Sequence, residues 1–282
     1  AHKNSSNWSP YKARQKSNSS SGSPQKSQGH PSQKSQRSHH KKPLETYTFN
    51  EADDRVFSVF RNHGFSEVPH SDRQQLTRFY QLLMENQKKE NFTRLLNLRD
   101  VAIKHFIDCL MIPRLTQLKF PLLDVGTGPG FPGIPLKIHF PKEKIILAEG
   151  VQKRVEFLKT VRDELELKNL DILGRNINAD CFYPVQGVIT RAVEDARNTL
   201  GNVMSCLQTG GRVYLMKGPG CDPEIEPALN TWGEYYKLVE DIAYQLPSTP
   251  HDRRLLVFEK YRATPLRDLN QALENEGDWD EN

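Results

Sequence analysis

The sequence has few cysteines, and they lack the spacing that would give them a structural role. Its four cysteines are scattered over 282 residues with no Cys-x-x-Cys pair, which argues against a zinc site or a disulfide framework. It also has no run of about 18 apolar residues and no secretory apolar segment. We therefore expect a soluble, cytoplasmic protein with no metal site and no contact with a membrane.

Acidic residues are absent from the first 44 positions. Residues 1–44 contain nine Lys and Arg and twelve Ser, with only Trp8, Tyr11 and Leu44 as large apolar side chains. We predict a disordered polybasic arm, because so little apolar surface cannot offset the chain entropy. The rest of the chain, residues 45–282, contains 30 Lys and Arg and 35 Asp and Glu, so this part is mildly acidic. The arm favours a polyanion such as RNA, with a solubilising leader or a transit peptide as the alternative.

The hydrophobic spacing changes near residue 119. Before it, apolar residues recur at helical spacing around 51–62, 71–84 and 101–115, and Ser71 to Gln74 has the form of a capping box. After it, short apolar runs alternate with helical stretches, which is typical of a parallel sheet covered by helices. We expect strands at 120–124, 144–149, 171–175, 187–191 and 211–216, helices near 132–139, 153–167, 195–207 and 223–231, and a final hairpin of 237–246 and 254–260.

This order of elements predicts an α/β fold with a Rossmann-like seven-stranded sheet and an N-terminal helical extension. A terminal antiparallel hairpin is typical of class I S-adenosylmethionine-dependent methyltransferases, whereas a dinucleotide-binding sheet continues as βαβ to its sixth strand. We predict four parts in the chain: the basic arm (1–44), N-terminal helices that pack on the core (45–118), a methyltransferase domain (119–262) and an acidic polar tail (263–282).

A glycine-rich loop, Asp124-Val-Gly-Thr-Gly-Pro-Gly-Phe-Pro-Gly133, joins the first predicted strand to the next helix. Asp124 can organise the turn, while Gly126 and Gly128 let bare backbone approach a ligand against which Phe131 would pack. Such a loop can hold the methionine end of S-adenosylmethionine. The same loop also contains GxGxxG, starting at Gly128, so a dinucleotide-dependent oxidoreductase remains an alternative.

Charged residues follow three later strands. Glu149 ends the second, where an acid would accept ribose hydroxyls in either cofactor class, with an exposed strand-end charge as the alternative. Arg191 emerges from the apolar fourth strand and needs a partner, which could be the cofactor, an RNA phosphate, or Glu194 or Asp195. Lys217 ends the fifth strand in the same way, so we expect an anion-facing rim of Arg191 and Lys217.

A set of motifs resembles one family. The motifs are Asn91-Phe-Thr93, His105-Phe-Ile-Asp-Cys-Leu110, the loop continued through Phe131-Pro-Gly-Ile-Pro-Leu136, Lys153-Arg-Val-Glu-Phe-Leu158, Thr190-Arg-Ala192 and Lys217-Gly218. Between about Asp72 and Glu259 the chain resembles the bacterial 16S rRNA guanine-N7 methyltransferases of the GidB type, also called ribosomal RNA small subunit methyltransferase G. It departs from that pattern at Glu149-Gly150, where the family usually has Asp-Ser, and at Asn86, which replaces a tryptophan.

The resemblance implies S-adenosylmethionine as the cofactor and 16S rRNA, free or in the small ribosomal subunit, as the partner of an enzyme that we expect to be monomeric. It implies that the cofactor is held by Gly126, Phe131, Asn176, Ile177 and Arg191, and that Arg175, Lys217 and Arg253 face the RNA. A non-catalytic rRNA-binding or ribosome-assembly factor that retains the fold is the second alternative.

The expected chemistry needs no general base. Guanine N7 has an in-plane lone pair and no proton to lose, so alignment and electrostatics suffice for direct in-line methyl transfer. His105 and Asp108 lie one helical turn apart, as an acid–base pair might. We expect them instead to pack the helix against the sheet or to shape the mouth of the substrate site.

Overall fold

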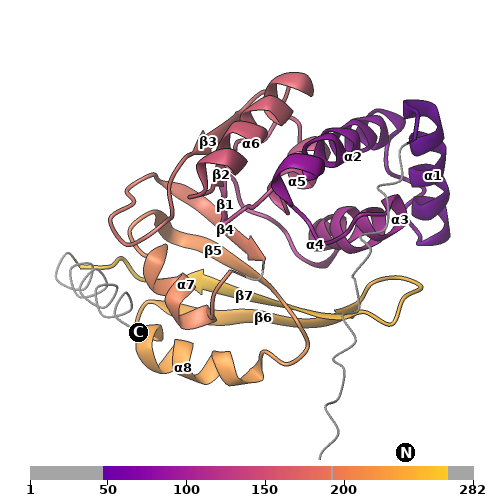
Figure 1. The fold of residues 1–282 in the computed structure, drawn as a ribbon. Coiled ribbons are helices and arrows are strands. Elements are labelled where there is room, and N and C mark those ends of the chain that lie inside the picture. The colour runs from indigo at the N-terminus through magenta and orange to yellow at the C-terminus, as the bar shows by residue number, and fades with distance from the viewer. Residues whose placement is uncertain (1–46, 192, 266–282) are drawn as a thin grey trace, which may run out of the picture. The chain divides into compact units, whose positions relative to one another are not determined.

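The computed structural model describes residues 47–191 and 193–265, without the side chains of 88–90. The predicted basic arm (1–44) lies outside the described residues, and so does all of the predicted tail beyond residue 265. The described strands form one seven-stranded sheet in the order β3-β2-β1-β4-β5-β7-β6 (Figure 1).

The sheet confirms the predicted α/β class. Strands β1 to β5 are parallel, and β7 lies antiparallel between β5 and β6, which completes the predicted hairpin. The strands are β1 (Leu122–Val125), β2 (Ile145–Ala148), β3 (Leu170–Leu173), β4 (Val185–Arg191), β5 (Leu207–Lys217), β6 (Tyr236–Gln245) and β7 (Asp252–Lys260). All the parallel strands therefore end at one edge, which is where ligands bind in open α/β sheets.

The helices are α1 (Phe49–Asn62), α2 (His70–Glu90), α3 (Leu98–Val101), η1 (Ala102–Ile107), α4 (Asp108–Leu115), α5 (Gly133–His139), α6 (Gln152–Glu164), α7 (Ala196–Asn202) and α8 (Asp222–Trp232). The capping box predicted at Ser71 is wrong, because α2 already begins at His70 and its N-cap makes no side-chain hydrogen bond. A capping box occurs instead at α1, where Thr48 and Glu51 bond each other's backbone N–H.

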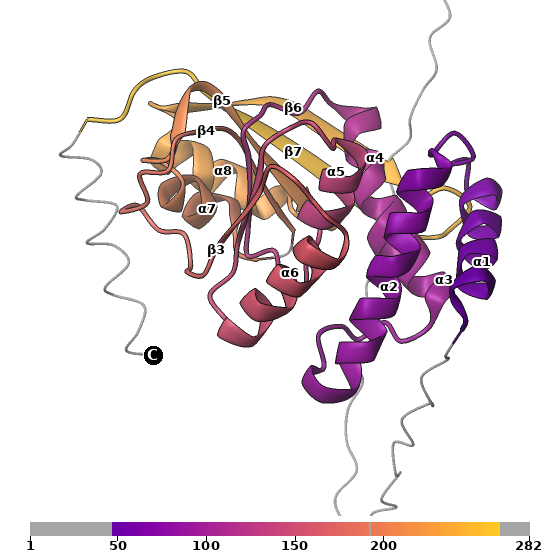
Figure 2. The same ribbon diagram turned by 90° about the horizontal axis from the view of Figure 1, so that it is seen from above.

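Two apolar cores cover the two faces of the sheet. Alternate residues of each strand point to opposite faces, so Leu122 and Leu147 join one core while Leu123 and Ile146 join the other. The first core contains the N-terminal helices together with α5 and α6, and the second contains α7 and α8. Figure 2 shows α1, α2 and α4 gathered on one side of the domain, with α7 and α8 on the other.

Two helices differ from the predicted ones. The helix predicted for 195–207 ends at Asn202, and the buried Lys260 of β7 donates to the carbonyl of Met204 in the turn that follows and to that of Leu207, where β5 begins. The helix predicted for 101–115 contains a π-helical turn, η1, directly before Asp108. Such turns often occur at functional sites.

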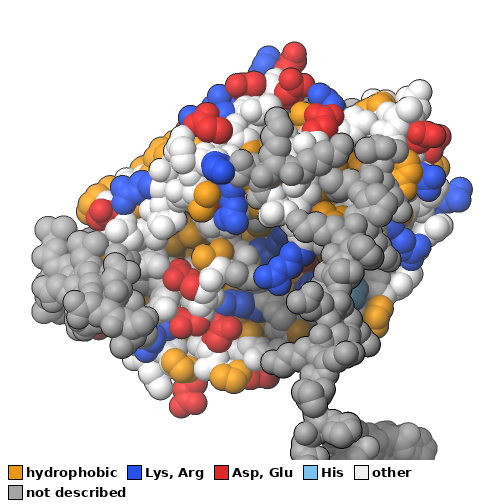
Figure 3. Space-filling model, viewed as in Figure 1, with side chains coloured by type: hydrophobic (Ala, Val, Ile, Leu, Met, Phe, Trp, Pro, Cys, Tyr) orange, Lys and Arg blue, Asp and Glu red, His pale blue; other side chains and the backbone are white. Residues whose placement is uncertain are grey.

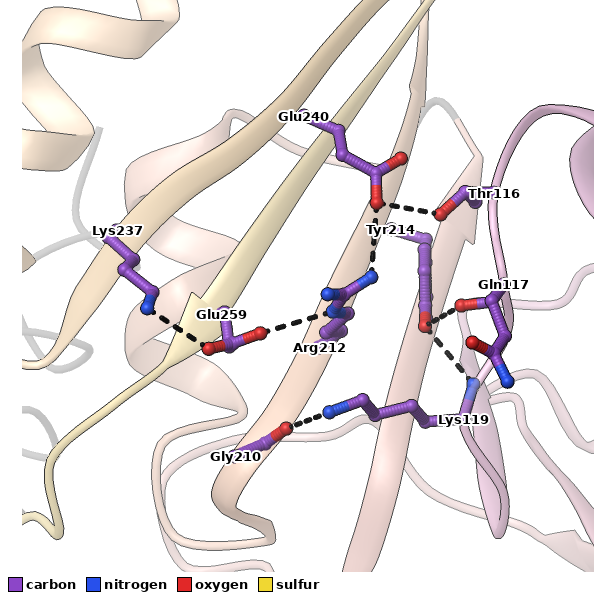
Figure 4. A network of polar contacts seen from close by, with 9 residues as sticks. All are labelled: Thr116, Gln117, Lys119, Gly210, Arg212, Tyr214, Lys237, Glu240 and Glu259. Atoms are coloured by element: carbon purple, nitrogen blue, oxygen red, sulfur yellow. Dashed lines mark hydrogen bonds and ion pairs between the residues drawn. The ribbon is translucent and has the colours of Figure 1, made fainter.

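A polar network fastens the segment that leads into β1 to the start of β5 (Figure 4). The hydroxyl of Tyr214 donates to the carbonyl of Gln117 at 2.8 Å and accepts from the N–H of Lys119 at 3.1 Å. Beside it, Arg212 bonds Glu240 of β6 at 3.0 Å and Glu259 of β7 at 3.2 Å. The Tyr214 contacts tie the segment between α4 and β1 to β5, and the Arg212 contacts join β5 to β6 and β7.

An ion pair joins α1 to α2. The guanidinium of Arg73 donates to both oxygens of Asp53, at 2.9 and 3.0 Å, and Thr77 donates a third hydrogen bond. Burial by itself would raise the pKa of Asp53, but these partners outweigh it and hold the pKa below its usual value. The pair therefore stabilises the fold above the unfolded-state pKa of about 3.9, and this contribution is lost as pH falls through the folded-state pKa.

We expect Asp53→Asn to lower the free energy of unfolding by about 2 kcal/mol near neutral pH, because Arg73 loses its charged partner. Urea unfolding of both proteins near pH 7 and near pH 3 measures the difference, which should shrink at the lower pH. The same difference at both pH values would contradict the assignment.

The four cysteines, Cys109, Cys181, Cys206 and Cys221, are all buried free thiols. Within the described ranges, no three His, Cys, Asp or Glu side chains are grouped as metal ligands. No helix in this part of the chain has the length and apolar character needed to cross a membrane.

Candidate active site

The glycine-rich loop opens at the carboxyl end of β1. Gly126 and Gly128 have φ angles of +65° and +61°, a region that side chains other than glycine rarely adopt. A Cβ on Gly126 would lie 2.7 Å from Val193, whereas a Cβ on Gly128 would meet no described atom within 4 Å. The loop therefore leaves open space directly at Gly128.

Asp124 organises this loop, as the sequence predicted. Its Oδ2 accepts hydrogen bonds from the hydroxyl of Thr127 at 2.6 Å and from the N–H of Gly133 at 2.7 Å. Its Oδ1 has no hydrogen-bond partner among the described residues. Complete burial raises the pKa of Asp124 to about 7, so the carboxylate is costly and is retained for the shape of the loop.

Glu149 joins the end of β2 to the loop. Its Oε2 accepts from the N–H of Gly128 at 2.9 Å, and its Oε1 accepts from the N–H of Val151 at 2.8 Å. The residue is only 5% exposed, so it is not the exposed strand-end charge considered as an alternative. Each carboxylate oxygen has two lone pairs, which leaves acceptor capacity for the hydroxyls of a ribose.

Asn176 and Ile177, which are predicted to lie beside the adenine, follow β3. Ile177 is buried in the second core, while the side chain of Asn176 lies over Gly150. A Cβ on Gly150 would lie 2.2 Å from Oδ1 of Asn176. The Gly150 that departs from the family pattern is thus matched to its neighbour, because a serine there would force Asn176 to move.

Phe131 packs among the N-terminal helices. Its ring stacks on that of His105 at 4.3 Å and lies 5.2 Å from that of Phe79, and the residue is 3% exposed. The guanidinium of Arg191 lies 5.3 Å from the Phe131 ring, within range of a cation–π interaction. Phe131 therefore links the loop, the η1 turn and the end of β4; its contact with the cofactor stays a prediction.

Arg191 is paired with Asp108 of α4. Its Nη1 lies 3.6 Å from Oδ2 of Asp108, and Arg253 approaches the other oxygen, Oδ1, with its Nε at 3.4 Å. The two acids weighed as partners of Arg191 are used elsewhere: Glu194 bonds Asn202, and Asp195 caps α7. The structure thus brings together two predicted site residues, Arg191 and Arg253, through a residue that the sequence did not single out for binding.

Lys217 and Arg175 have acidic partners other than Asp108. Lys217 forms an ion pair with Glu224 of α8 at 2.7 Å, and its side chain is 9% exposed. The structure joins Arg191 to Arg253 through Asp108, and the anion-facing rim expected from Arg191 and Lys217 stays a prediction. Arg175 is about half exposed and pairs with Asp180 in the loop after β3. The RNA-facing roles of these cations stay predictions.

His105 and Asp108 do not form an acid–base pair. His105 Nε2 lies 3.2 Å from the hydroxyl of Thr93, and Asp108 bonds the two arginines and Tyr244. Burial, together with the nearby charge of Arg191, lowers the pKa of His105 to about 3, so the ring is neutral. Thr93 and Asp108 belong to the two N-terminal motifs, Asn-Phe-Thr and His-x-x-Asp. Membership in these motifs was the sequence signal that could have identified both residues as part of the site.

The residues present fit an adenosyl cofactor. Gly128 provides a cradle that any Cβ would enter, and Glu149, bonded to the same backbone, provides the carboxylate for a ribose.

Comparisons with known proteins agree on one family. A family model described as rRNA small subunit methyltransferase G matches residues 72–242. Ribosomal RNA small subunit methyltransferase G 2 of Bdellovibrio bacteriovorus is 68% identical over 235 residues, which is 83% of this chain and 92% of that protein. The protein of the same name from Syntrophobacter fumaroxidans is 41% identical over 73% of this chain and 41% of its own length.

A third relative, ribosomal RNA small subunit methyltransferase G of Carboxydothermus hydrogenoformans, is 35% identical over 75% of this chain and 92% of its own length. These matches confirm the resemblance that the motifs indicated, and they do not support the oxidoreductase alternative. The chain belongs to the GidB family, the rRNA small subunit methyltransferases G.

Proposed function

We propose that this protein transfers the methyl group of S-adenosylmethionine directly to N7 of a guanine in 16S rRNA. As a member of its family, the chain is an S-adenosylmethionine-dependent methyltransferase of small-subunit rRNA. The proposal concerns the acceptor atom, the residues that hold cofactor and RNA, and the form of the RNA. We take the assembled small subunit and free 16S rRNA as the two substrates to compare.

One observation supports the choice of N7: three titratable groups near Arg191 are paired, neutral or fully buried. Asp108 is bound by two arginines, His105 is neutral and stacked on Phe131, and Asp124 is fully buried beneath the loop. None of these is placed to remove a proton from a substrate. Such a site suits guanine N7, which attacks through a lone pair and has no proton to lose.

Three groups of residues would act in the transfer. Bound S-adenosylmethionine supplies an electrophilic methyl group on its sulfonium. Gly126 and Gly128 would admit its methionine end, Glu149 would accept from the ribose, and Asn176 with Ile177 would flank the adenine. Arg191 and Arg253 would fix the anionic groups of cofactor and RNA, so that N7 and the methyl carbon stay in line.

Basic side chains support an RNA partner. Figure 3 shows Lys and Arg side chains in the middle of this face of the molecule, over the region where β4 and β5 end in Figure 1. Phosphate contacts by such cations position a nucleic acid without reading its sequence.

Incubation of the enzyme with labelled S-adenosylmethionine and unmodified 16S rRNA or small subunits tests the proposal. We expect label in 7-methylguanosine after nuclease digestion and chromatography, with about one methyl per RNA. RNA that already carries the modification is the matched control and should take up no label. Label at any other atom would contradict the choice of N7.

A further inference from the structure

The carboxylate of Asp108 connects three strands at the edge of the sheet where the site lies. Arg191 reaches it from β4 at 3.6 Å, Arg253 from β7 at 3.4 Å, and the hydroxyl of Tyr244 from β6 donates to it at 3.3 Å. Asp108 itself is 3% exposed and begins α4, directly after the η1 turn. We refer to these four residues as the Asp108 cluster.

The charges of the Asp108 cluster do not cancel. Two guanidinium groups share one carboxylate, and His105, the nearest histidine in the same helical segment, is neutral. The cluster therefore keeps an excess of one positive charge. A partly buried excess charge of this kind is satisfied by an anion from outside, such as a carboxylate or a phosphate.

Each arginine also keeps free donor capacity. A guanidinium has five N–H donors, and Arg191 uses Nη1 on Asp108 and on the carbonyl of Lys104 at 3.3 Å. The side chains of Arg191 and Arg253 are 19% and 27% exposed, so part of each remains accessible. An arginine held in advance loses less conformational entropy when it binds an anion than a free one does.

We propose that Asp108 is a positioning residue of the methyl transfer: it holds Arg191 beside the cofactor loop and Arg253 at the same edge, so that both cations face cofactor and RNA in one arrangement. This inference rests on the proposed function. Asp108 acts only through the arginines, because its oxygens are directed to them and to Tyr244 and the residue is almost wholly buried.

Asp108→Asn tests the role, with Asp53→Asn as the matched control. Asp53 is also a buried aspartate bound to an arginine, but it joins α1 to α2. We expect Asp108→Asn to have a kcat/KM for the RNA about 100-fold lower than that of Asp53→Asn. Its affinity for S-adenosylhomocysteine, measured by calorimetry, should be about tenfold lower than that of Asp53→Asn. Melting temperatures show whether the two variants lose comparable stability.

A double-mutant cycle separates positioning from a general loss of structure. Because Asp108 acts partly through Arg253, Asp108→Asn should cost clearly less in kcat/KM once Arg253→Gln is already present than the loss of about 100-fold expected in the wild-type background. Asp108→Glu keeps the negative charge, so its kcat/KM should lie between that of the wild type and that of Asp108→Asn. If Asp108→Asn does not fold, Asp108→Glu replaces it in the test, and a decrease in kcat/KM of at least about threefold supports the inference.

The inference is overturned if Asp108→Asn stays within about threefold of Asp53→Asn in both kcat/KM and affinity for S-adenosylhomocysteine, or if the cycle is additive. Failure of the proposed function is a different result, seen in the wild-type protein as label at an atom other than N7. The affinity for S-adenosylhomocysteine still tests the position of Arg191 in that case.

Discussion

Gly128→Ala is expected to weaken the binding of S-adenosylhomocysteine by about 100-fold, because the new methyl group would enter the open space beside Glu149 in which we propose that the cofactor binds. The substitution also places alanine at a φ of +61°, which costs about 1–2 kcal/mol of stability. Isothermal titration calorimetry measures the affinity, and thermal unfolding measures the stability.

Gly210→Ala is the matched control for this backbone cost. Gly210 has a φ of +81° and, like Gly128, no described atom within 4 Å of a Cβ, but it lies in β5 near Arg212 at the opposite edge of the sheet. Gly210→Ala should lose similar stability and keep the wild-type affinity for S-adenosylhomocysteine. Equal affinities of the two variants would show that the cofactor does not occupy the space at Gly128.

Arg191→Ala is expected to lower kcat/KM for rRNA methylation by about 1000-fold. The variant loses the cation beside Phe131 and leaves Asp108 with Arg253 alone, so both the fixed charge and the position of the second arginine change. Initial rates of label transfer at several RNA concentrations give kcat and KM separately. The loss should lie partly in kcat, since the charge is needed when the reacting atoms are aligned.

Arg212→Ala is the control for removing a paired, partly buried arginine. Its side chain is 23% exposed, against 19% for Arg191, and it bonds two acidic side chains, Glu240 and Glu259, where Arg191 bonds one (Figure 4). We expect Arg212→Ala to lower the melting temperature while kcat/KM stays within about threefold of wild type. If Arg191→Ala kept a tenth of the wild-type kcat/KM or more, Arg191 would have no central role in the reaction.

Local patterns predicted the sheet because each strand carries its own signal. The apolar runs that became β1, β2 and β4 were short, bounded and separated by helical stretches, and this regularity is typical of a parallel sheet. The loop at Gly126 and Gly128 and the acid at Glu149 were equally visible, since their spacing follows from one strand–loop–helix–strand unit. Residue 149 proved to bond the backbone of Gly128 itself.

The capping of α2 and the end of α7 could not be predicted in this way. A capping box at Ser71 matches the local pattern, but the chain already turns into a helix at His70. After the end of α7, the carbonyls of Met204 and Leu207 accept hydrogen bonds from Lys260, which is more than fifty residues away in sequence and so gives no local signal.

Local sequence patterns predict the order of helices and strands, the glycine-rich loop and the acid that follows β2, because all three depend on neighbours within one supersecondary unit. The partners of the cations depend instead on how the elements pack: Arg191 bonds Asp108 and not Glu194, and Lys217 bonds Glu224. Asp108, Arg191 and Arg253 lie on three elements with no common spacing in the chain, and they meet because the packing of α4 against the strand ends buries one carboxylate between two arginines.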